Sequence, residues 1–246
     1  GEYGYSEMSY MYSEKKYESS PLNRQIAEIG IGREWKTRNK RVTYQTSINT
    51  DTQIRHLVLT NNGGIKCIGN YPIGTLLSKR TVDEDGLSYS SFYNSNGEII
   101  MSRKESVMQN IDLYYVYDSY GRVAWVITPA YRDSLVVGTT HSAVTLKKHA
   151  YRYVYDEYGR VVEKHFPSPE SNAVYYIYDL NDRVVMSQDA SMRAKDAHLW
   201  SYYQYDTYNR KTECGEITVE YLTNRSAIAS MVKSQGGALP SGVKEP

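Results

Sequence analysis

The sequence predicts a mainly β protein, built as an antiparallel sheet of consecutive hairpins with little helix. Three observations support this fold class. A strand–turn–strand unit recurs along the chain, its turns carry residues typical of tight hairpin connections, and its strands alternate tyrosine with aliphatic residues. The chain has 246 residues, which is long enough for one large β domain or two smaller ones with a real core.

The repeated unit is clearest in the stretch Tyr153-Val-Tyr-Asp-Glu-Tyr-Gly-Arg-Val-Val162. Three more strong copies begin at Tyr115, Tyr176 and Tyr203, and weaker copies begin at Leu57 and Ser91. Internal repetition of this kind predicts stacked, near-identical hairpins that share one continuous core. The residues assigned to this structural motif are Tyr115, Tyr117, Asp118, Gly121, Arg122, Tyr153, Tyr155, Asp156, Gly159, Arg160, Tyr176, Tyr178, Asp179, Arg183, Tyr203, Tyr205, Asp206 and Arg210.

The turn residues give the strongest physical evidence for hairpins. A short polar side chain stands first in each turn, where it accepts hydrogen bonds from the backbone N–H groups that follow. The fourth residue is a type that tolerates positive φ, so we expect a type I turn followed by a left-handed residue that forms a bulge. The first positions are Thr60, Asn94, Asp118, Asp156, Asp179 and Asp206, and the fourth are Gly63, Gly97, Gly121, Gly159, Asp182 and Asn209.

The strands before these turns have two different faces. Alternation places Tyr153 and Tyr155 on one side of the sheet and Val154 on the other. Val116 and Ile177 repeat this choice, whereas the last copy has Gln204 there. If the hairpins stack in register, the tyrosines of neighbouring copies are expected to form aromatic ladders.

Before the repeats, the chain reads as short strands and turns. Residues 1–16 have no clear period and are expected to form a loosely placed strand or a tail. Residues 17–24 contain Pro21 and Asn23, which mark a turn. The basic stretch at residues 36–41 is interpreted as a solvated loop before a strand at residues 42–48.

The rest of the chain interrupts or ends the repeats. Residues 133–149 lack a clean period and are expected to form a surface insertion. Residues 224–234 have an N-cap and helical apolar spacing, which predicts a short helix, and residues 235–246 are expected to be a disordered exit. We therefore expect an N-terminal part with degenerate hairpins (1–110), four strong repeats (111–217) and a helix with a tail (218–246).

The composition bounds the function. With a net charge of +1, the chain has no general attraction for nucleic acid, and no apolar run approaches the ~18 residues of a membrane span. Its 26 tyrosines need apolar contact for their rings and partners for their hydroxyls, which favours thin, half-wet layers. Cys67 and Cys214 could pair, but two isolated thiols are the favoured interpretation.

The repeated aspartates admit a catalytic and a structural interpretation. Paired carboxylates at a fixed separation are the machinery of glycoside hydrolases. However, a catalytic pair occurs once, whereas an Asp four residues before an Arg recurs in every strong copy. We therefore expect each Asp to cap its turn, and each Arg to pair with that Asp or with a neighbouring hairpin.

The sequence contains no other catalytic, metal or cofactor motif. The histidines His56, His141, His149, His165 and His198 lie outside metal-ligand spacings, and no Gly-x-Ser-x-Gly nucleophile motif is present. We expect the protein not to be an enzyme, to bind no metal and to need no cofactor.

Three tyrosines at the third turn position are the candidate ligand-binding residues: Tyr120, Tyr158 and Tyr208. The favoured interpretation is that each ring folds over the adjacent hairpin and packs there. The alternative is that the rings are exposed and stack on sugar faces or on another protein.

The units Tyr-x-Tyr-Asp-x-x-Gly-Arg resemble the YD repeats of RHS-type proteins, the bacterial relatives of teneurins. Residues 17–24, Tyr71-Pro-Ile-Gly-Thr-Leu76, Asp83-Glu-Asp-Gly86 and residues 182–189 are similar to the flanks of one RHS-associated subgroup. Asp182 and Asn209 depart from the repeat glycine, and Lys211 from the apolar residue after the arginine. No autoproteolytic core motif and no toxin-like domain are found.

The resemblance implies a sheet that curls into a spiral or partial shell on large secreted or surface-anchored proteins. In that family some shells enclose a toxin, and other members are described as adhesive or sugar-binding. We therefore predict a structural, non-enzymatic segment of an extracellular or cell-surface protein, with the rest of a larger polypeptide as its partner. The alternative is a binding module for a glycan or a surface protein.

Overall fold

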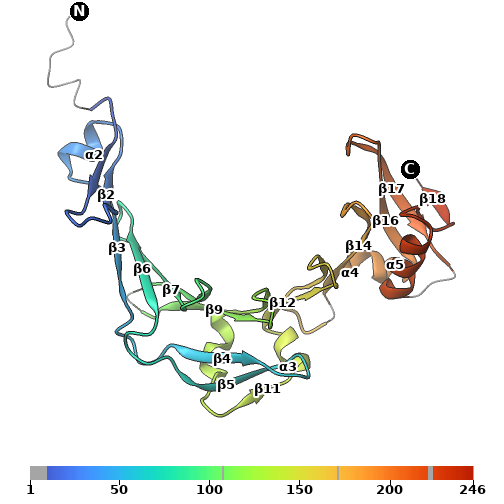
Figure 1. Ribbon diagram of the computed structural model, residues 1–246, viewed down its shortest axis with the longest axis horizontal. Coiled ribbons are helices and arrows are strands. Elements are labelled where there is room, and N and C mark those ends of the chain that lie inside the picture. Colours follow the sequence, from blue (N-terminus) through green and yellow to red (C-terminus); the bar gives the residue numbers. More distant parts are fainter. Residues whose placement is uncertain (1–9, 107, 171, 221–223, 246) are drawn as a thin grey trace, which may run out of the picture. The chain divides into compact units, whose positions relative to one another are not determined.

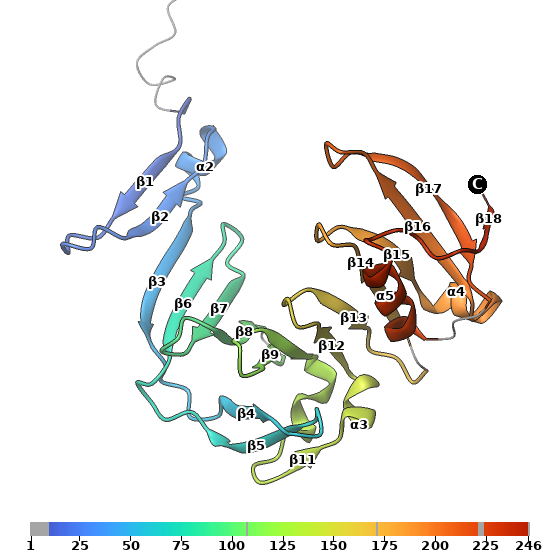
Figure 2. The same ribbon diagram turned by 45° about the vertical axis from the view of Figure 1, so that its right-hand side comes forward.

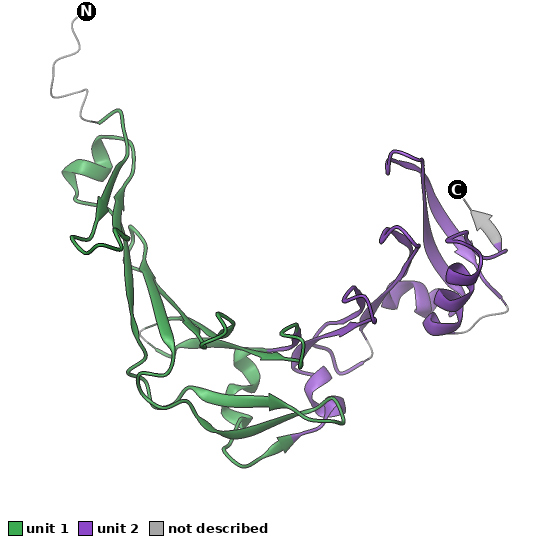
Figure 3. Ribbon diagram, viewed as in Figure 1, with its two compact units in different colours: residues 1–122, 127–140 green, residues 123–126, 141–246 purple. Residues whose placement is uncertain are grey.

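The computed structural model describes residues 10–106, 108–170, 172–220 and 224–245. These residues form a mainly β chain whose neighbouring strands run antiparallel, as the sequence predicts (Figure 1). Two compact units can be separated (Figure 3): residues 1–122 with 127–140, and residues 123–126 with 141–246. These divisions differ from the expected boundaries after residues 110 and 217. The main reason is that residues 127–140 pack with the first unit, although residues 123–126 belong to the second.

In the first unit, the main strands lie in the order β1-β2-β3-β6-β7-β8-β9. The strand predicted at residues 42–48 is β3, and helix α2 overlaps the start of the basic stretch that was interpreted as a loop. The elements are β1 (Glu14–Tyr17), β2 (Gln25–Ile29), α2 (Arg33–Thr37), β3 (Val42–Ile48), β6 (Leu77–Val82), β7 (Ser88–Tyr93), β8 (Ile99–Lys104) and β9 (Ile111–Tyr117). Residues 1–9 of the expected N-terminal strand or tail lie outside the described residues.

A separate small sheet has the order β11-β5-β4, with β4 at Arg55–Leu59, β5 at Ile65–Asn70 and β11 at Thr140–His141. The first weak repeat therefore forms a hairpin, but the hairpin leaves the main sheet (Figure 1). Residues 138 and 139 hydrogen-bond to this hairpin. The Gly138 N–H donates to the Cys67 carbonyl, and the Cys67 N–H donates to the Thr139 carbonyl. The predicted insertion is thus a set of short elements, including the 3-10 helix η1 (Pro129–Ser134) and α3 (Ala143–Lys147).

In the second unit, the strands lie in the order β10-β12-β13-β14-β15-β16-β17-β18. Three of the strong repeats supply its hairpins: β12–β13, β14–β15 and β16–β17. The elements are β10 (Val123–Ile127), β12 (Ala150–Tyr155), β13 (Val161–His165), β14 (Ala173–Tyr178), β15 (Val184–Gln188), α4 (Ala190–Lys195), β16 (Leu199–Tyr205), β17 (Lys211–Thr218), α5 (Arg225–Ser234) and β18 (Val243–Glu245).

Helix α5 covers one face of this sheet, beside β14 (Figure 2). The helix begins where the sequence predicts, since the Asn224 side chain accepts a hydrogen bond from the Ala227 N–H at 2.8 Å. Ile228 and Val232 are fully buried and belong to one hydrophobic cluster with Ile177, Met186, Trp200, Tyr202 and Ile217. Fully burying an aliphatic side chain contributes about 1.5–3 kcal/mol, so the cluster holds the helix to the strands.

The chain after α5 is not the disordered exit that the sequence suggests. Residues 243–245 form β18, which pairs with Glu216–Thr218 of β17. Gly237 adopts φ +93°, and a Cβ atom there would lie 3.2 Å from Asp179 Cβ. The small residues after α5 therefore allow the backbone to pass close to the sheet. The same Gly/Pro/Ser composition is also typical of disordered segments, so composition alone does not distinguish the two.

Both cysteines are free thiols, as the favoured interpretation states. Cys67 is buried in β5, and Cys214 is exposed on β17.

Candidate functional site

Each strong repeat forms the same closed turn around its aspartate. In the turn that begins at Asp156, Oδ1 accepts hydrogen bonds from the backbone N–H groups of Tyr158 (3.0 Å) and Arg160 (2.9 Å). The second carboxylate oxygen accepts the Arg160 Nε–H at 2.7 Å. The Asp156 carboxylate therefore accepts three hydrogen bonds. The same three bonds are made by Asp118, Asp179 and Asp206.

The fourth residue of each turn adopts the left-handed conformation that the sequence predicts. Gly121 has φ +73° and Gly159 has φ +82°. Asp182 (φ +61°) and Asn209 (φ +63°) keep this conformation although they depart from the repeat glycine. Asp and Asn accept positive φ more readily than most residues do, so the departure leaves the turn intact.

The arginine of one repeat also binds the turn of the next. Arg160 Nη1 donates to the Asp179 carbonyl at 3.2 Å and to Asp182 Oδ1 at 2.7 Å. A second junction repeats this geometry, with bonds from Arg183 to the Asp206 carbonyl (3.3 Å) and to Asn209 Oδ1 (3.0 Å). The two residues that replace glycine are therefore the acceptors for the preceding arginine. The sequence analysis did not predict this role. The available signal was that Asp182 and Asn209 each lie in the copy that comes directly after a copy with the repeat arginine.

The second tyrosine of each repeat reaches back to the preceding hairpin. The Arg160 guanidinium lies 4.7 Å from the centroid of the Tyr178 ring, and the Tyr178 hydroxyl donates to the Val161 carbonyl at 2.9 Å. At Tyr178 and Tyr205 the described ring neighbour is thus an arginine rather than the tyrosine of the expected ladder. Three other tyrosine hydroxyls donate to a backbone carbonyl in the same way, each at 2.9 Å: Tyr117 to Ile99, Tyr155 to Val123 and Tyr205 to Val184.

The electrostatics of these contacts favour bonding. Burial acts to raise the pKa of Asp156, but the hydrogen bonds from the Arg160 backbone and side chain outweigh it and lower that pKa. Burial raises the pKa of the Tyr178 hydroxyl. The carboxylate is therefore ionised, and the hydroxyl carries its proton, at neutral pH. These are the forms that accept from arginine and donate to a carbonyl.

The turn tyrosines do not pack over neighbouring hairpins as expected. Tyr120 is 80% exposed and Tyr208 is 78% exposed. Each ring lies instead beside the arginine of its own turn, at 4.8 Å from Arg122 and 5.3 Å from Arg210. The described neighbour of each ring is thus a charged group of its own turn, and the ring stays largely exposed.

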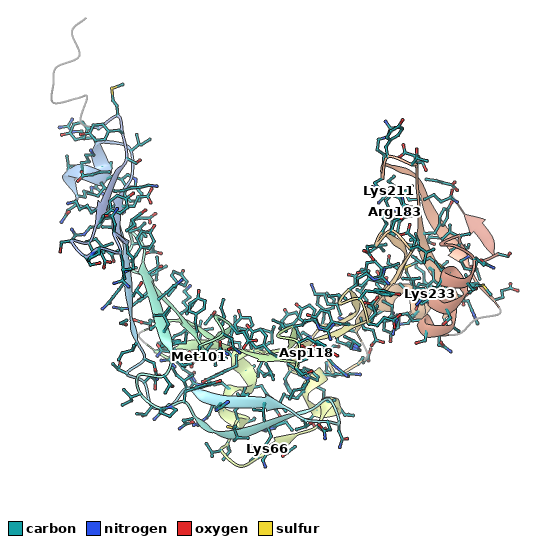
Figure 4. The ribbon with its side chains drawn as sticks, in the orientation of Figure 1. Lys66, Met101, Asp118, Arg183, Lys211 and Lys233 are labelled. Atoms are coloured by element: carbon teal, nitrogen blue, oxygen red, sulfur yellow. The ribbon has the colours of Figure 1, made fainter. Side chains whose placement is uncertain are left out.

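Tyr158 differs from the other turn tyrosines, because it borders a cavity of about 390 Å³ beside helix α5. The Lys233 ammonium, on that helix (Figure 4), lies 3.3 Å from the Tyr158 hydroxyl and 3.0 Å from Glu157 Oε1. Val162, Ile177 and Ala229 add apolar lining. The cavity thus combines an exposed aromatic ring, a short apolar lining and paired charges within the second unit.

Among the described residues, no group of three or more His, Cys, Asp or Glu side chains is placed to hold a metal ion. Within the same residues, no helix has the length and apolar character needed to cross a membrane. The predicted lack of catalytic, metal and cofactor function stays a prediction.

Comparison with known proteins gives a short family match and distant structural likeness. The family model described as "Domain of unknown function (DUF6443)" matches residues 1–48. No match is found among curated protein sequences. A structure reported as "Crystal Structure of TcdB2-TccC3" is similar at 14% identity and a TM-score of 0.46, covering 85% of this chain and 9% of that one.

A structure of the Photorhabdus luminescens Tc holotoxin pore, which also contains TccC3, is similar at 14% identity and a TM-score of 0.47. It too covers 85% of this chain and 9% of the solved chain. The present sequence therefore spans about a tenth of the length of the chains that it matches.

Proposed function

We propose that the chain is a structural, non-enzymatic segment of a larger RHS/YD-repeat protein, where it forms part of a β wall. The observation that carries this proposal is the bonding between repeats in the second unit. Arg160 and Arg183 each bond to their own turn aspartate and to the next turn. Side chains that bond neighbouring hairpins to each other are expected in a repeat protein whose sheet continues from one copy to the next.

The same bonds argue against a catalytic role for the repeated aspartates. Each carboxylate is occupied by backbone N–H groups and an arginine, and the set recurs in all four strong copies. A hydrolase assay in which one of these aspartates is required, but not its equivalents, would contradict this part of the proposal. A location at the cell surface or outside the cell follows from the resemblance, and protease digestion of intact cells tests it.

Electron microscopy of the complete parent polypeptide tests the structural role. We expect the repeats at residues 111–217 to lie within a continuous β wall, with further strands hydrogen-bonded beside them. A segment that appears as a separate compact domain on a linker would contradict the proposal.

A second candidate function is the binding of a glycan or a surface protein. The observation that favours it is the exposure of Tyr120 and Tyr208, together with the cavity beside Tyr158. Aromatic rings stack on the apolar faces of sugars, and a pocket with a few polar groups is the usual form of a small-ligand site.

A glycan array with single Tyr→Ala variants tests the second candidate. If the cavity binds a sugar, Tyr158→Ala is expected to weaken binding about tenfold, since losing a stacked ring costs on the order of 1 kcal/mol. Tyr120→Ala and Tyr208→Ala are the matched controls, because these rings occupy the same turn position but do not line this cavity. An array without hits, or equal effects at all three positions, would remove the cavity as the site.

A further inference from the structure

We propose that Arg210 and the outer edge of β17, residues 211–215, bind one further hairpin of the Tyr-x-Tyr-Asp type. This hairpin is supplied from outside the described residues. The inference rests on the proposed structural function and names the partner of this particular edge. It rests on a contrast within the second unit. Two junctions between repeats are complete, whereas the matching groups of the fourth strong repeat have no partner hairpin among the residues that the structure describes.

The two complete junctions define what a docked hairpin contributes. In each, a guanidinium faces the ring of the next second tyrosine, that tyrosine donates its hydroxyl to the residue after the arginine, and Nη1 binds the next turn. Burial follows from these contacts. The side chains of Arg160 and Arg183 are 21% and 22% exposed.

The fourth strong repeat presents the same groups without these contacts. Within the described part of the chain, the Arg210 side chain contacts Asp206 and Tyr208 of its own turn, and it is 75% exposed. Lys211 follows it, in the position whose carbonyl accepts a tyrosine hydroxyl in the other repeats.

The strand edge beside Arg210 is open as well. β18 pairs with β17 at Glu216, Ile217 and Thr218, and no strand of the described chain pairs with the outer edge of residues 211–215. A strand edge that no neighbouring strand covers is a template for β-strand addition, in which main-chain bonds give affinity and side-chain contacts give register.

The register of a docked strand follows from the existing junctions. The residue four positions after the arginine pairs with the residue four positions before the second tyrosine: Lys164 with Val174, and Ser187 with Ser201. Cys214 is the corresponding residue on β17. It is an exposed free thiol, and Cys67 is buried, so Cys214 reports on this edge selectively.

A second copy of this chain is a less suitable partner. Its first hairpin also has a tyrosine before an acidic turn residue, Tyr17 and Glu18, and an arginine that binds that residue. The same register would place Glu14 opposite Glu213 and Lys16 opposite Lys211. Like charges directly opposite each other destabilise a strand pair. Three of the four strong repeats instead place a tyrosine at the first of these positions, and three place an aliphatic residue at the second: Tyr114, Tyr175 and Tyr202, and Val116, Val154 and Ile177.

Disulfide trapping on the intact protein tests the inference. The probe is a synthetic peptide of residues 173–188, the β14–β15 hairpin, which contains no cysteine. Each cysteine variant of the peptide carries its thiol activated as a mixed disulfide with 2-thiopyridine. With Val174→Cys, we expect the Cys214 thiolate to displace the thiopyridine and form a disulfide with the peptide, because directly opposed residues bring their Cβ atoms about 4.5–5.5 Å apart. A Tyr176→Cys peptide is the register control, since its thiol would be a diagonal neighbour.

The contacts of Arg210 supply the second arm of the experiment. Arg210→Gln in the protein and Tyr178→Phe in the peptide are each expected to reduce trapping, the first about tenfold, because an arginine contact with charged and carbonyl oxygens is lost. Arg38→Gln is the matched control, since Arg38 is exposed and pairs with a carboxylate four residues earlier. Cys214→Ser should abolish trapping.

Three results would overturn the inference: equal yields for the two cysteine peptides, trapping that is unchanged by Arg210→Gln, or a Cys214-linked dimer that outcompetes the peptide. Failure of trapping is distinguishable from failure of the structural function. A parent polypeptide that shows a continuous β wall, with this edge covered in another way, would remove only the docking partner.

Discussion

Replacing Asp179 by alanine is expected to lower the free energy of unfolding of the second unit by about 3 kcal/mol, a large loss for a domain of ordinary stability. The Asp179 side chain is 5% exposed, and its carboxylate accepts two backbone N–H groups and the Arg183 guanidinium. Removal leaves these donors without their acceptor in a partly buried turn. Burial acts to raise the pKa of Asp179, but the bonds from Arg183 lower it overall.

Denaturant unfolding followed by circular dichroism measures this loss, and Asp206→Ala is the matched control. Asp206 makes the same three bonds, but its arginine is exposed, and no further hairpin of the described chain stacks on its turn. We expect a much smaller change for this variant. Equal losses at the two positions would mean that the hairpin-to-hairpin contact adds nothing to the turn itself.

Replacing Asp112 by asparagine is expected to destabilise the first unit by about 3–5 kcal/mol, because one partner of a buried ion pair is removed. Asp112 is buried in β9, and it accepts bonds from Arg103 Nε (2.7 Å) and Nη2 (2.9 Å). Asp51 accepts a further bond from Arg103 at 2.7 Å, and the hydrogen bonding of the Arg103 side chain to Asp112 is the largest cause that raises the pKa of Arg103.

The control for this prediction is Asp133→Asn. Asp133 also pairs with an arginine, Arg132, but its side chain is exposed. A solvated ion pair contributes little, so we expect a change within about 0.5 kcal/mol. Thermal or denaturant unfolding of both variants measures the difference. If the free energy of unfolding falls as little for Asp112→Asn as for Asp133→Asn, the ion pairs of Arg103 do not stabilise the first unit.

The turns could be predicted from sequence because their causes are local. An Asp that bonds to the next backbone N–H groups and a fourth residue at positive φ act within five residues. Asn224 and the apolar spacing after it identified α5 for the same reason. The sequence also indicated the faces of the strands, since Val116 and Ile177 are buried.

The contacts between repeats could not be predicted from sequence in the same way. The bond from Arg160 to Asp182 spans 22 residues, and the sequence does not state which hairpin will be the neighbour. The exposed rings of Tyr120 and Tyr208 show the same limit. Whether such a ring packs depends on which surface adjoins it in the fold, and here each ring lies beside the arginine of its own turn.

The small sheet illustrates the effect of distant segments. The first weak repeat has the same strand and turn layout as the others, and it does form the hairpin β4–β5. Its sheet is nevertheless set by the pairing of Cys67 with residues 138 and 139, about seventy residues later in a stretch without periodic pattern. Local propensity therefore determined the hairpin, and tertiary contacts determined its neighbours.

The division into two units has a consequence for cutting the chain. Because residues 123–126 belong to one unit and residues 127–140 to the other, the polypeptide crosses between the units three times. Cleavage of a single peptide bond therefore cannot release either unit whole. A fragment that ends at residue 122 loses the strand pairing that residues 138 and 139 give to β5, and one that begins at residue 141 lacks β10. A truncation that keeps either unit whole must therefore retain residues of the other.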